Sequence, residues 1–211
     1  MSKLLKREYV KDGYYHIFNR GNRKIDVFFD GQDYTYFLGL LAECLSPAPL
    51  IAKHWRKTKN YHGRIHLLSF CPMPNHFHLS IQQTDTYAIS EFMQSICNRY
   101  TKYFNKKYET VGHSFQDKFK ARRIVDDADL INVTKYIHLN PSKKSIRKSE
   151  AYPYSSLQYF LGNSPTPEWL SIEKIINVFH GNFNVAPKNF FVEYRKFLEA
   201  NQEGDFSDFE D

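Results

Sequence analysis

The sequence predicts an α+β fold: a ferredoxin-like antiparallel sheet with helices on one face, followed by a small C-terminal helical extension. Two strand-like runs, at 64–71 and 76–83, are joined by PMPN, whose prolines and Asn75 require a tight connection, so we expect a β-hairpin. Helical and strand-like segments alternate around it in the order β, α, β, β, α, β, α. This order is typical of an antiparallel sheet on which the intervening helices pack.

The segments before the hairpin supply one strand and one helix. Aromatic and β-branched residues at 14–19 end in the turn-prone NRGNRK, which predicts a strand leading into a basic loop. Apolar residues recur at helical spacing over 32–45 and predict an amphipathic helix. The polar, basic segment 52–64 has neither pattern, and we expect a loop or a hairpin tip there.

Helical and strand signals continue after the hairpin. Ser90 is a candidate N-cap for a helix that runs to the basic NKK at 105–107. The run at 118–125 predicts a further strand, and LINVTKYIHL at 130–139 predicts a helix that stops before Pro141. These segments complete the predicted sheet and add a last helix to it.

We divide the chain into three parts. We expect a main domain over 1–150, a helical accessory region over 151–198, and an acidic, disordered tail over 199–211. The helical stretches of the accessory region are expected near 154–161, 171–179 and 187–199. A chain of 211 residues with 42% hydrophobic residues can bury one such core and carry a small appendage.

The distribution of charge favours a polyanionic partner. The formal net charge is +6, and the last thirteen residues hold six acidic residues and no Lys or Arg, so residues 1–198 carry about +12. Nucleic acid is therefore the leading partner, although a basic surface also serves solubility alone. No apolar run is long enough to cross a membrane and no secretory signal is visible, so we expect a cytoplasmic protein without a membrane partner. We expect the three cysteines, Cys44, Cys71 and Cys97, to be reduced core residues.

Two histidines form a candidate metal site. His76 and His78 lie two apart on a predicted strand, so both point to one face while Phe77 points to the other. Neutral imidazole nitrogen is a common ligand of divalent metal ions. Taken alone, however, a strand His-x-His pair is more often structural than metal-binding.

A second pair lies on the last predicted helix of the main domain. Tyr136 and Asn140 are four residues apart and therefore share one helix face. A phenol with a reference pKa of about 10 needs a nearby cation to act as a nucleophile, so a catalytic tyrosine should lie beside a metal site. Because the chain has 15 tyrosines, the spacing alone does not single out Tyr136.

Five segments together resemble the REP-associated tyrosine transposases, a group within the single-tyrosine HUH family. They are YYHIFNRGNRK at 14–24, PNHFH at 74–78, SFQDKFKARRI at 114–124, YIHLNP at 136–141 and YPYSSLQYF at 152–160. The resemblance covers roughly residues 8–161, in a consistent order. The segments 46–64 and 162–211 carry no motif that matches.

The resemblance implies the HUH endonuclease fold and a role for each motif. It implies that His76 and His78 are metal ligands, that Asn140 completes the site for Mg²⁺ or Mn²⁺, and that Tyr136 is the nucleophile. The implied activity is that of a transposase, which cuts single-stranded DNA at hairpin sequences through a covalent 5′-phosphotyrosine intermediate and then transfers the strand. The implied state is a monomer or a homodimer.

Basic residues around these motifs are candidates for contact with DNA phosphates. They are Arg20, Arg23, Lys24, Lys118, Lys120, Arg122 and Arg123. Phe119 is available for stacking on unpaired bases, while for each basic residue a solvated surface charge is at least as good an interpretation. The remaining histidines of interest are expected to be structural: His16, His66, His113 and His138.

Three other functions remain open. A replication initiator or conjugative relaxase uses the same HUH and tyrosine chemistry. A non-catalytic or domesticated repeat-DNA-binding protein would use the same basic core without cutting. A metal-dependent hydrolase would use activated water and form no protein–DNA adduct.

Overall fold

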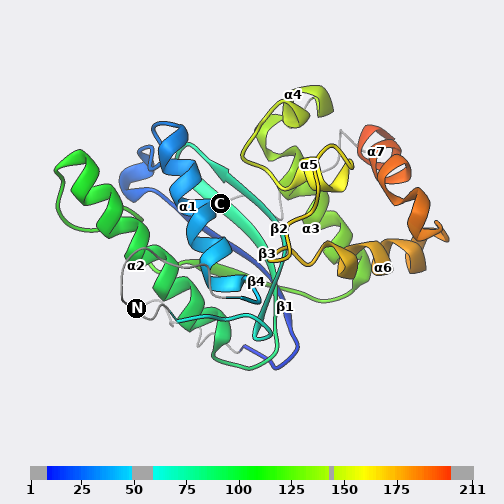
Figure 1. Cartoon of the computed structure of the whole chain (residues 1–211), viewed down its shortest axis with the longest axis horizontal. Coiled ribbons are helices and arrows are strands. Elements are labelled where there is room, and N and C mark those ends of the chain that lie inside the picture. Colours follow the sequence, from blue (N-terminus) through cyan, green and yellow to red (C-terminus); the bar gives the residue numbers. More distant parts are fainter. Residues whose placement is uncertain (1–8, 49–58, 143–144, 201–211) are drawn as a thin grey trace, which may run out of the picture.

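A four-stranded antiparallel sheet forms the centre of the molecule (Figure 1), as seen in a computed structural model that describes residues 9–48, 59–142 and 145–200. The strands are arranged in the order β2-β3-β1-β4. Their bounds are β1 (Tyr14–Arg20), β2 (Ile65–Met73), β3 (His76–Gln83) and β4 (Lys120–Ile124). The predicted fold class, an α+β protein with a ferredoxin-like antiparallel sheet, is confirmed, and the hairpin over PMPN is the β2–β3 connection.

Two helices, α1 (Gly31–Leu45) and α2 (Ala88–Tyr108), cover one face of this sheet. Strand residues such as Ile17 and Phe77 are fully buried against them. The ring of Phe37 on α1 lies 5.2 Å from that of Phe77, measured between centroids. As expected, α1 connects β1 to β2, α2 connects β3 to β4, and both helices pack on the sheet.

A third helix, α3 (Asp127–Leu139), lies on the opposite face, so the helices are not confined to one face as expected. The physical reason is that this face also carries apolar side chains: Leu68 and Cys71 of β2 are fully buried in a second core with α3. The elements that follow complete this half of the molecule (Figure 1): η2 (Asn140–Ser142), α4 (Ile146–Glu150), α5 (Leu157–Phe160), α6 (Ile172–Phe183), η3 (Pro187–Asn189) and α7 (Phe190–Ala200).

Most predicted boundaries are close to those observed, with one wrong cap. Ser90 lies inside α2, which begins two residues earlier, whereas Asp126 caps α3 by accepting a hydrogen bond from the backbone nitrogen of Asp129 at 2.8 Å. Most of the expected loop at 52–64, and residues 201–211 of the expected tail, lie outside the described residues. The domain division at residue 150 stays a prediction.

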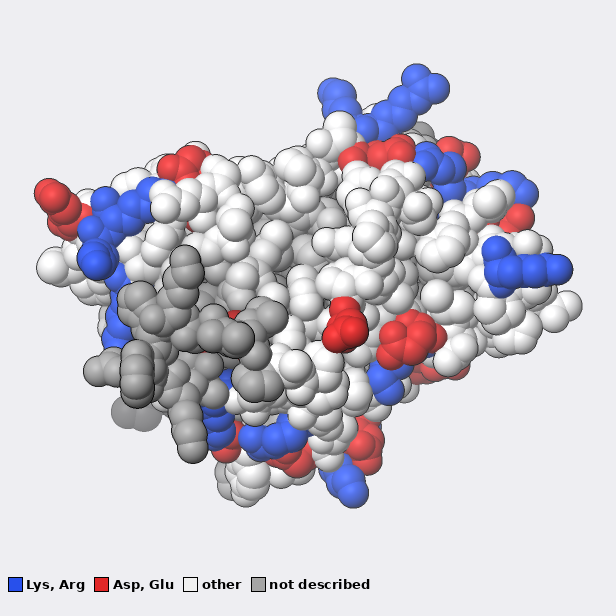
Figure 2. Space-filling model, viewed as in Figure 1, with Lys and Arg blue, Asp and Glu red and all other residues white. Residues whose placement is uncertain are grey.

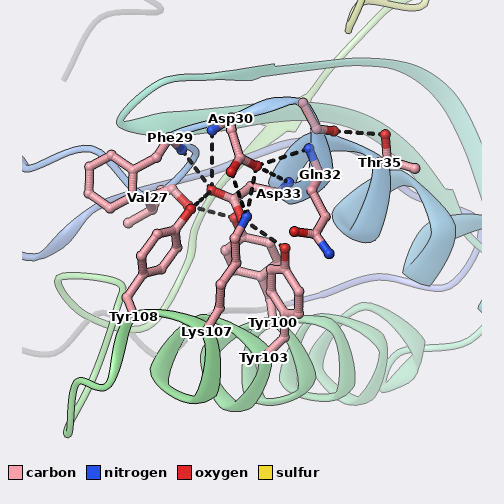
Figure 3. Close-up of polar contacts among 11 residues, drawn as sticks. Val27, Phe29, Asp30, Gln32, Asp33, Thr35, Tyr100, Tyr103, Lys107 and Tyr108 are labelled. Atoms are coloured by element: carbon pink, nitrogen blue, oxygen red, sulfur yellow. Dashed lines mark hydrogen bonds and ion pairs between the residues drawn. The ribbon is translucent and has the colours of Figure 1, made fainter.

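A buried carboxylate ties the two helices of the first face together (Figure 3). Asp33 is fully buried at the start of α1 and accepts hydrogen bonds from the hydroxyls of Tyr103 and Tyr108 and from the ammonium of Lys107, at 2.7–2.8 Å. Although burial raises the pKa of Asp33, the bonds from Lys107 and the tyrosines outweigh it and hold the pKa below its ordinary value. The network also binds the backbone nitrogen of Phe29, which fixes the end of the loop after β1.

The cysteines, the surface charge and the apolarity of the helices can each be compared with what the sequence predicts. All three cysteines are free, and Cys44 and Cys71 are buried while Cys97 is half-buried. Figure 2 shows Lys and Arg scattered around the rim of the visible face and mixed with Asp and Glu, without a continuous basic patch among the coloured and white atoms. Among the described residues, no helix has the length and apolarity needed to cross a membrane.

Candidate active site

The pleat of the two central strands brings the candidate metal ligands to the face that α3 covers. In the β1–β3 ladder, Arg20 lies opposite His76 and Phe18 lies opposite His78. Residues directly opposite in a ladder share a face, so these four side chains project together. Phe77 points to the other face and is fully buried there, as its position between the histidines predicts.

The candidate ligands converge at the end of α3. Nε2 of His76 lies 3.3 Å from Oδ1 of Asn140, the residue at which α3 ends, and the rings of His76 and His78 have centroids 4.9 Å apart. Two ligands at about 2.1 Å from a Mg²⁺ ion and at right angles to each other are about 3 Å apart. The separation of His76 and Asn140 therefore fits neighbouring positions around one such ion.

A hydrogen bond orients each histidine through its Nδ1 atom. Nδ1 of His76 lies 2.6 Å from Oδ1 of Asn75, and Nδ1 of His78 lies 2.9 Å from Nε2 of His16. Because Nδ1 is engaged in both rings, the nitrogen that each would offer to a metal is Nε2. Metal-binding histidines are commonly oriented in this way. Two imidazoles and an amide oxygen thus fit a divalent cation, although no cluster of three or more His, Cys, Asp or Glu with metal-binding geometry occurs in the described part of the chain.

Tyr136 lies beside the same histidines. Its ring is 5.2 Å from that of His78 and 5.7 Å from that of His16, in edge-to-face contacts. The side chain is 4% exposed, so it is nearly buried between α3 and the sheet. His76, Asn140, Phe18 and Arg20 are all half-buried and form the more open side of the site.

The helix that carries Tyr136 is fixed to the sheet at its start by an ion pair. Asp129 in the first turn of α3 receives two hydrogen bonds from Arg122 of β4, at 2.7 and 3.0 Å. The two side chains are 33% and 15% exposed, so the pair is partly shielded from water. This contact sets the start of α3 against the edge of the sheet on the face of the histidines.

The early part of the chain matches a family model over residues 9–140, which include the two histidines, Tyr136 and Asn140. That model describes the IS200-like transposases. The chain belongs to the IS200-like transposase family. A comparison with curated protein sequences finds no significant match.

Solved structures agree with this assignment at the level of the fold. The structure of a REP-associated tyrosine transposase bound to a REP hairpin has a TM-score of 0.55 and 17% identity, and the alignment covers 81% of this chain and 92% of that one. The resemblance inferred from the motifs is thus confirmed for the IS200-like transposase family by the family model and for the fold by this structure. A crystal structure of a protein from Deinococcus radiodurans R1 gives a TM-score of 0.40 at 15% identity over 65% and 95% of the two chains, a likeness too distant to bear on the fold.

In this IS200-like transposase the loop after β1 is hydrogen-bonded to the turn of the β2–β3 hairpin. The backbone nitrogens of Val27 and Phe28 donate to the carbonyl of Pro74, and the backbone nitrogen of Gly21 donates to the carbonyl of Asn75. The amide of Asn75 in turn donates to the carbonyl of Lys24 at 3.2 Å. Asn75 therefore joins the basic loop to His76, the neighbouring candidate ligand.

Only some of the predicted DNA-binding residues lie beside the candidate site. Arg20 lies on the histidine face, and its Nε atom is buried without a hydrogen-bond partner among the described residues. The exposed Arg23 and Lys24 form the loop next to Asn75.

The other predicted basic residues lie on or just before β4. Exposed Lys118 precedes this strand, and exposed Lys120 lies across from Phe18 with its ammonium 5.5 Å from that ring. The paired Arg122 is also on the histidine face, whereas Arg123 lies opposite Tyr15 and so projects to the other face.

Two residues of the site were not predicted from the sequence. His16 was expected to be structural and Phe18 was not singled out, yet both rings lie against His78, with centroids 5.1 and 5.9 Å away. The signal that could have found them is the period of two along β1, which puts His16, Phe18 and Arg20 on one face. Burial lowers the pKa of His16 to about 3, helped by the charge of Arg122, so its ring is neutral near pH 7.

The histidine of the YIHLNP motif, His138, lies behind the site, as expected. His138 is fully buried and faces away from the sheet histidines, with Nδ1 at 2.8 Å from the hydroxyl of Tyr194 and Nε2 at 2.8 Å from the hydroxyl of Ser156. The oxygen of Ser156 also accepts from the backbone nitrogen of Phe70 in β2 at 2.9 Å. His138 thus connects α3 both to the sheet and to α7.

Proposed function

We propose that this transposase cuts and rejoins single-stranded DNA at hairpin sequences, with Tyr136 as nucleophile and Mg²⁺ or Mn²⁺ held by His76, His78 and Asn140. The observation that carries the proposal is the edge-to-face contact of Tyr136 with His78, at 5.2 Å between ring centroids. It joins a tyrosine on α3 to strand histidines far away in the sequence, within one chain. Hairpin DNA is proposed as the partner because the REP-associated tyrosine transposase of similar fold is bound to a REP hairpin.

The proposed reaction exchanges one phosphodiester for another. The phenolic oxygen of Tyr136 attacks phosphorus, an O–P bond to the tyrosine forms, and the bond from phosphorus to the 3′ oxygen breaks. The phenolic proton is lost, and the departing 3′ oxygen gains a proton. A 3′-hydroxyl later attacks the 5′-phosphotyrosine in the reverse sense, so the strand is rejoined without a nucleotide cofactor.

Each group of the site has a role in this reaction. When bound, the divalent ion supplies Lewis-acid polarisation of the phosphate. Arg20, on the same face as His76, is suited to bind the phosphate with its guanidinium. Because Tyr136 is 4% exposed, entry of the phosphate must be accompanied by a shift of its ring or of α3.

The surface around the site is suited to an unpaired strand. Phe18 is half-buried beside His78 and offers a ring on which a base can stack. Arg23 and Lys24 on one side, and Lys118 and Lys120 on the other, provide positive charge for the backbone. We propose that the strand at the cleavage point runs between these two groups.

A labelled-DNA assay tests the proposal. A pool of hairpin oligonucleotides with randomised single-stranded flanks is incubated with protein and Mn²⁺, then separated on a denaturing gel. A 5′-phosphotyrosine retains the fragment on the 3′ side of the cut, so a 3′ label should move to the protein while a 5′ label is released. EDTA and Tyr136→Phe should abolish the adduct, and Tyr87→Phe, at a position 72% exposed outside the site, should preserve it.

The alternative functions give different results in the same assay. Cleavage that releases both labels would indicate hydrolysis by water, and binding without cleavage would indicate a non-catalytic DNA-binding protein. Equal cleavage of strands without a hairpin would favour a replication initiator or relaxase. An undiminished adduct with Tyr136→Phe would contradict the assigned nucleophile.

A further inference from the structure

A third histidine lies directly behind the candidate metal site. His16, on the middle of β1, is fully buried, and its Nε2 atom lies 2.9 Å from Nδ1 of His78. The two rings are nearly parallel, with an interplanar angle of 23°. The ring of His16 also contacts Phe18 at 5.0 Å and Tyr136 at 5.7 Å, so it is packed on several sides.

The direction of this hydrogen bond decides what His78 can do. A neutral imidazole has one N–H donor and one acceptor nitrogen. If His16 donates from Nε2, then Nδ1 of His78 is the acceptor and the proton of His78 sits on Nε2, where it blocks a metal. If His78 donates from Nδ1, its Nε2 carries the lone pair that a metal ion requires.

We propose that His16 is a positioning residue for the metal: it accepts a hydrogen bond from Nδ1–H of His78 and so keeps Nε2 of His78 available as the ligand. This inference rests on the proposed metal site of the transposase. It requires His16 to carry its own proton on Nδ1. Such an outer hydrogen bond holds the ligand ring in one orientation and one tautomer, and its loss commonly costs about 10- to 100-fold in metal affinity.

His76 has its own partner, which makes the two ligands comparable. Its Nδ1 atom lies 2.6 Å from Oδ1 of Asn75. An amide oxygen only accepts, and Nε2 of His76 also faces one, Oδ1 of Asn140, at 3.3 Å. The shorter contact, with Asn75, therefore places the proton of His76 on Nδ1. His16 performs for His78 the task that Asn75 performs for His76, and both ligands then offer Nε2 to the same ion.

The test separates the hydrogen bond from packing with two substitutions. His16→Phe keeps a ring of similar size against Phe18 and Tyr136 but removes the acceptor. His16→Gln removes the ring but can place an amide oxygen where Nε2 lies. We expect the affinity for Mn²⁺, measured by electron paramagnetic resonance on the full chain, to fall about 10- to 100-fold in His16→Phe and to stay within about threefold of wild type in His16→Gln.

A second measurement needs neither metal nor a variant of His16. Long-range ¹H–¹⁵N spectra of the metal-free wild-type protein, assigned with His78→Ala, report which nitrogen of His78 is protonated. We expect a proton on Nδ1. A proton on Nε2 would overturn the inference, as would wild-type affinity for Mn²⁺ in a folded His16→Phe protein. If the wild-type protein binds no Mn²⁺, the proposed metal site fails and the role of His16 towards the metal fails with it, whereas metal binding with a proton on Nε2 of His78 would overturn the role of His16 alone.

Discussion

The hydroxyl of Tyr194, on α7, lies 2.8 Å from Nδ1 of His138, on α3, and both side chains are fully buried. One consistent set of hydrogen bonds satisfies the whole group: Tyr194 donates to His138, and Nε2–H of His138 donates to Ser156. The C-terminal helices therefore hold, from behind, the helix that presents Tyr136 to the histidines of the sheet.

The first prediction concerns the hydrogen bond between Tyr194 and His138. Tyr194→Phe leaves Nδ1 of His138 buried without its donor, which should lower the free energy of unfolding by about 1–3 kcal/mol. We also expect slower formation of the DNA adduct, by severalfold, because α3 is held less firmly against the sheet. Thermal unfolding and the adduct assay measure the two effects, with Tyr87→Phe as control. Loss of stability with an unchanged adduct rate would mean that α7 does not position Tyr136.

The second prediction is a pH dependence of stability. Burial lowers the pKa of His138 from 6.5 to about 3, so the unfolded chain binds a proton that the folded protein rejects. The stabilisation by neutral His138 is complete above pH 6.5 and is lost as the pH falls from 6.5 towards 3. Between pH 7 and pH 5 this loss amounts to about 2 kcal/mol.

Urea unfolding at pH 7, 6 and 5 measures the effect of His138. The wild-type protein should lose more stability than His138→Gln over this range, because the variant lacks the titrating ring. Lowered carboxylate pKa values, such as that of Glu150 beside Arg195, act at lower pH and are common to both proteins. Equal pH slopes for the two proteins would contradict the buried, neutral state of His138.

The third prediction concerns the loop that carries Arg23 and Lys24. A Cβ atom at Gly21 would lie 2.1 Å from the carbonyl oxygen of Ile25, so Gly21→Ala must displace this loop without removing a charge. We expect severalfold weaker binding of a hairpin oligonucleotide in fluorescence anisotropy, and a loss of about 1–3 kcal/mol in stability. Gly39→Ala is the matched control, because apart from its chain neighbours and the nearby backbone of α1 no heavy atom lies within 4 Å of its added Cβ.

The fourth prediction concerns the charge of Arg20. Arg20→Gln should weaken binding of single-stranded DNA and reduce the slope of log affinity against log salt by about 0.7, the contribution of one phosphate contact. Arg123→Gln, at an exposed position on the opposite face, should change binding much less. Equal effects of the two substitutions would indicate that Arg20 contributes only to the general charge of the protein.

The fold could be predicted because its signals are local. The hairpin over PMPN, the alternation in 76–83 and the helical spacing of 32–45 each act within a few residues. The helix layer that α3 forms on the second face of the sheet could not be predicted. The apolar side chains of β2 that α3 covers are recognised as one face only once the bulge between Leu67 and Ser69 is known. Ser90 was a plausible cap by type, but α2 starts without any side-chain cap.

The candidate site was predicted in part. His76, His78, Tyr136 and Asn140 were singled out by spacing and by resemblance, and the structure brings these four together. His16 was missed because its importance depends on the pairing of β1 with β3, a contact between distant parts of the chain. Arg122 and Arg123 could not be told apart by sequence, since only the ladder with β1 shows which of them faces the histidines.

The central claim is that Tyr136 forms the covalent bond to DNA, and peptide mass spectrometry of the adduct tests it most directly. After nuclease and trypsin digestion, the remaining nucleotide should be found on a peptide that ends at Lys143 and contains YIHLNPSK. Fragmentation should then assign it to Tyr136. A nucleotide on any other tyrosine, such as Tyr152 or Tyr154 of the YPYSSLQYF motif, would contradict the account.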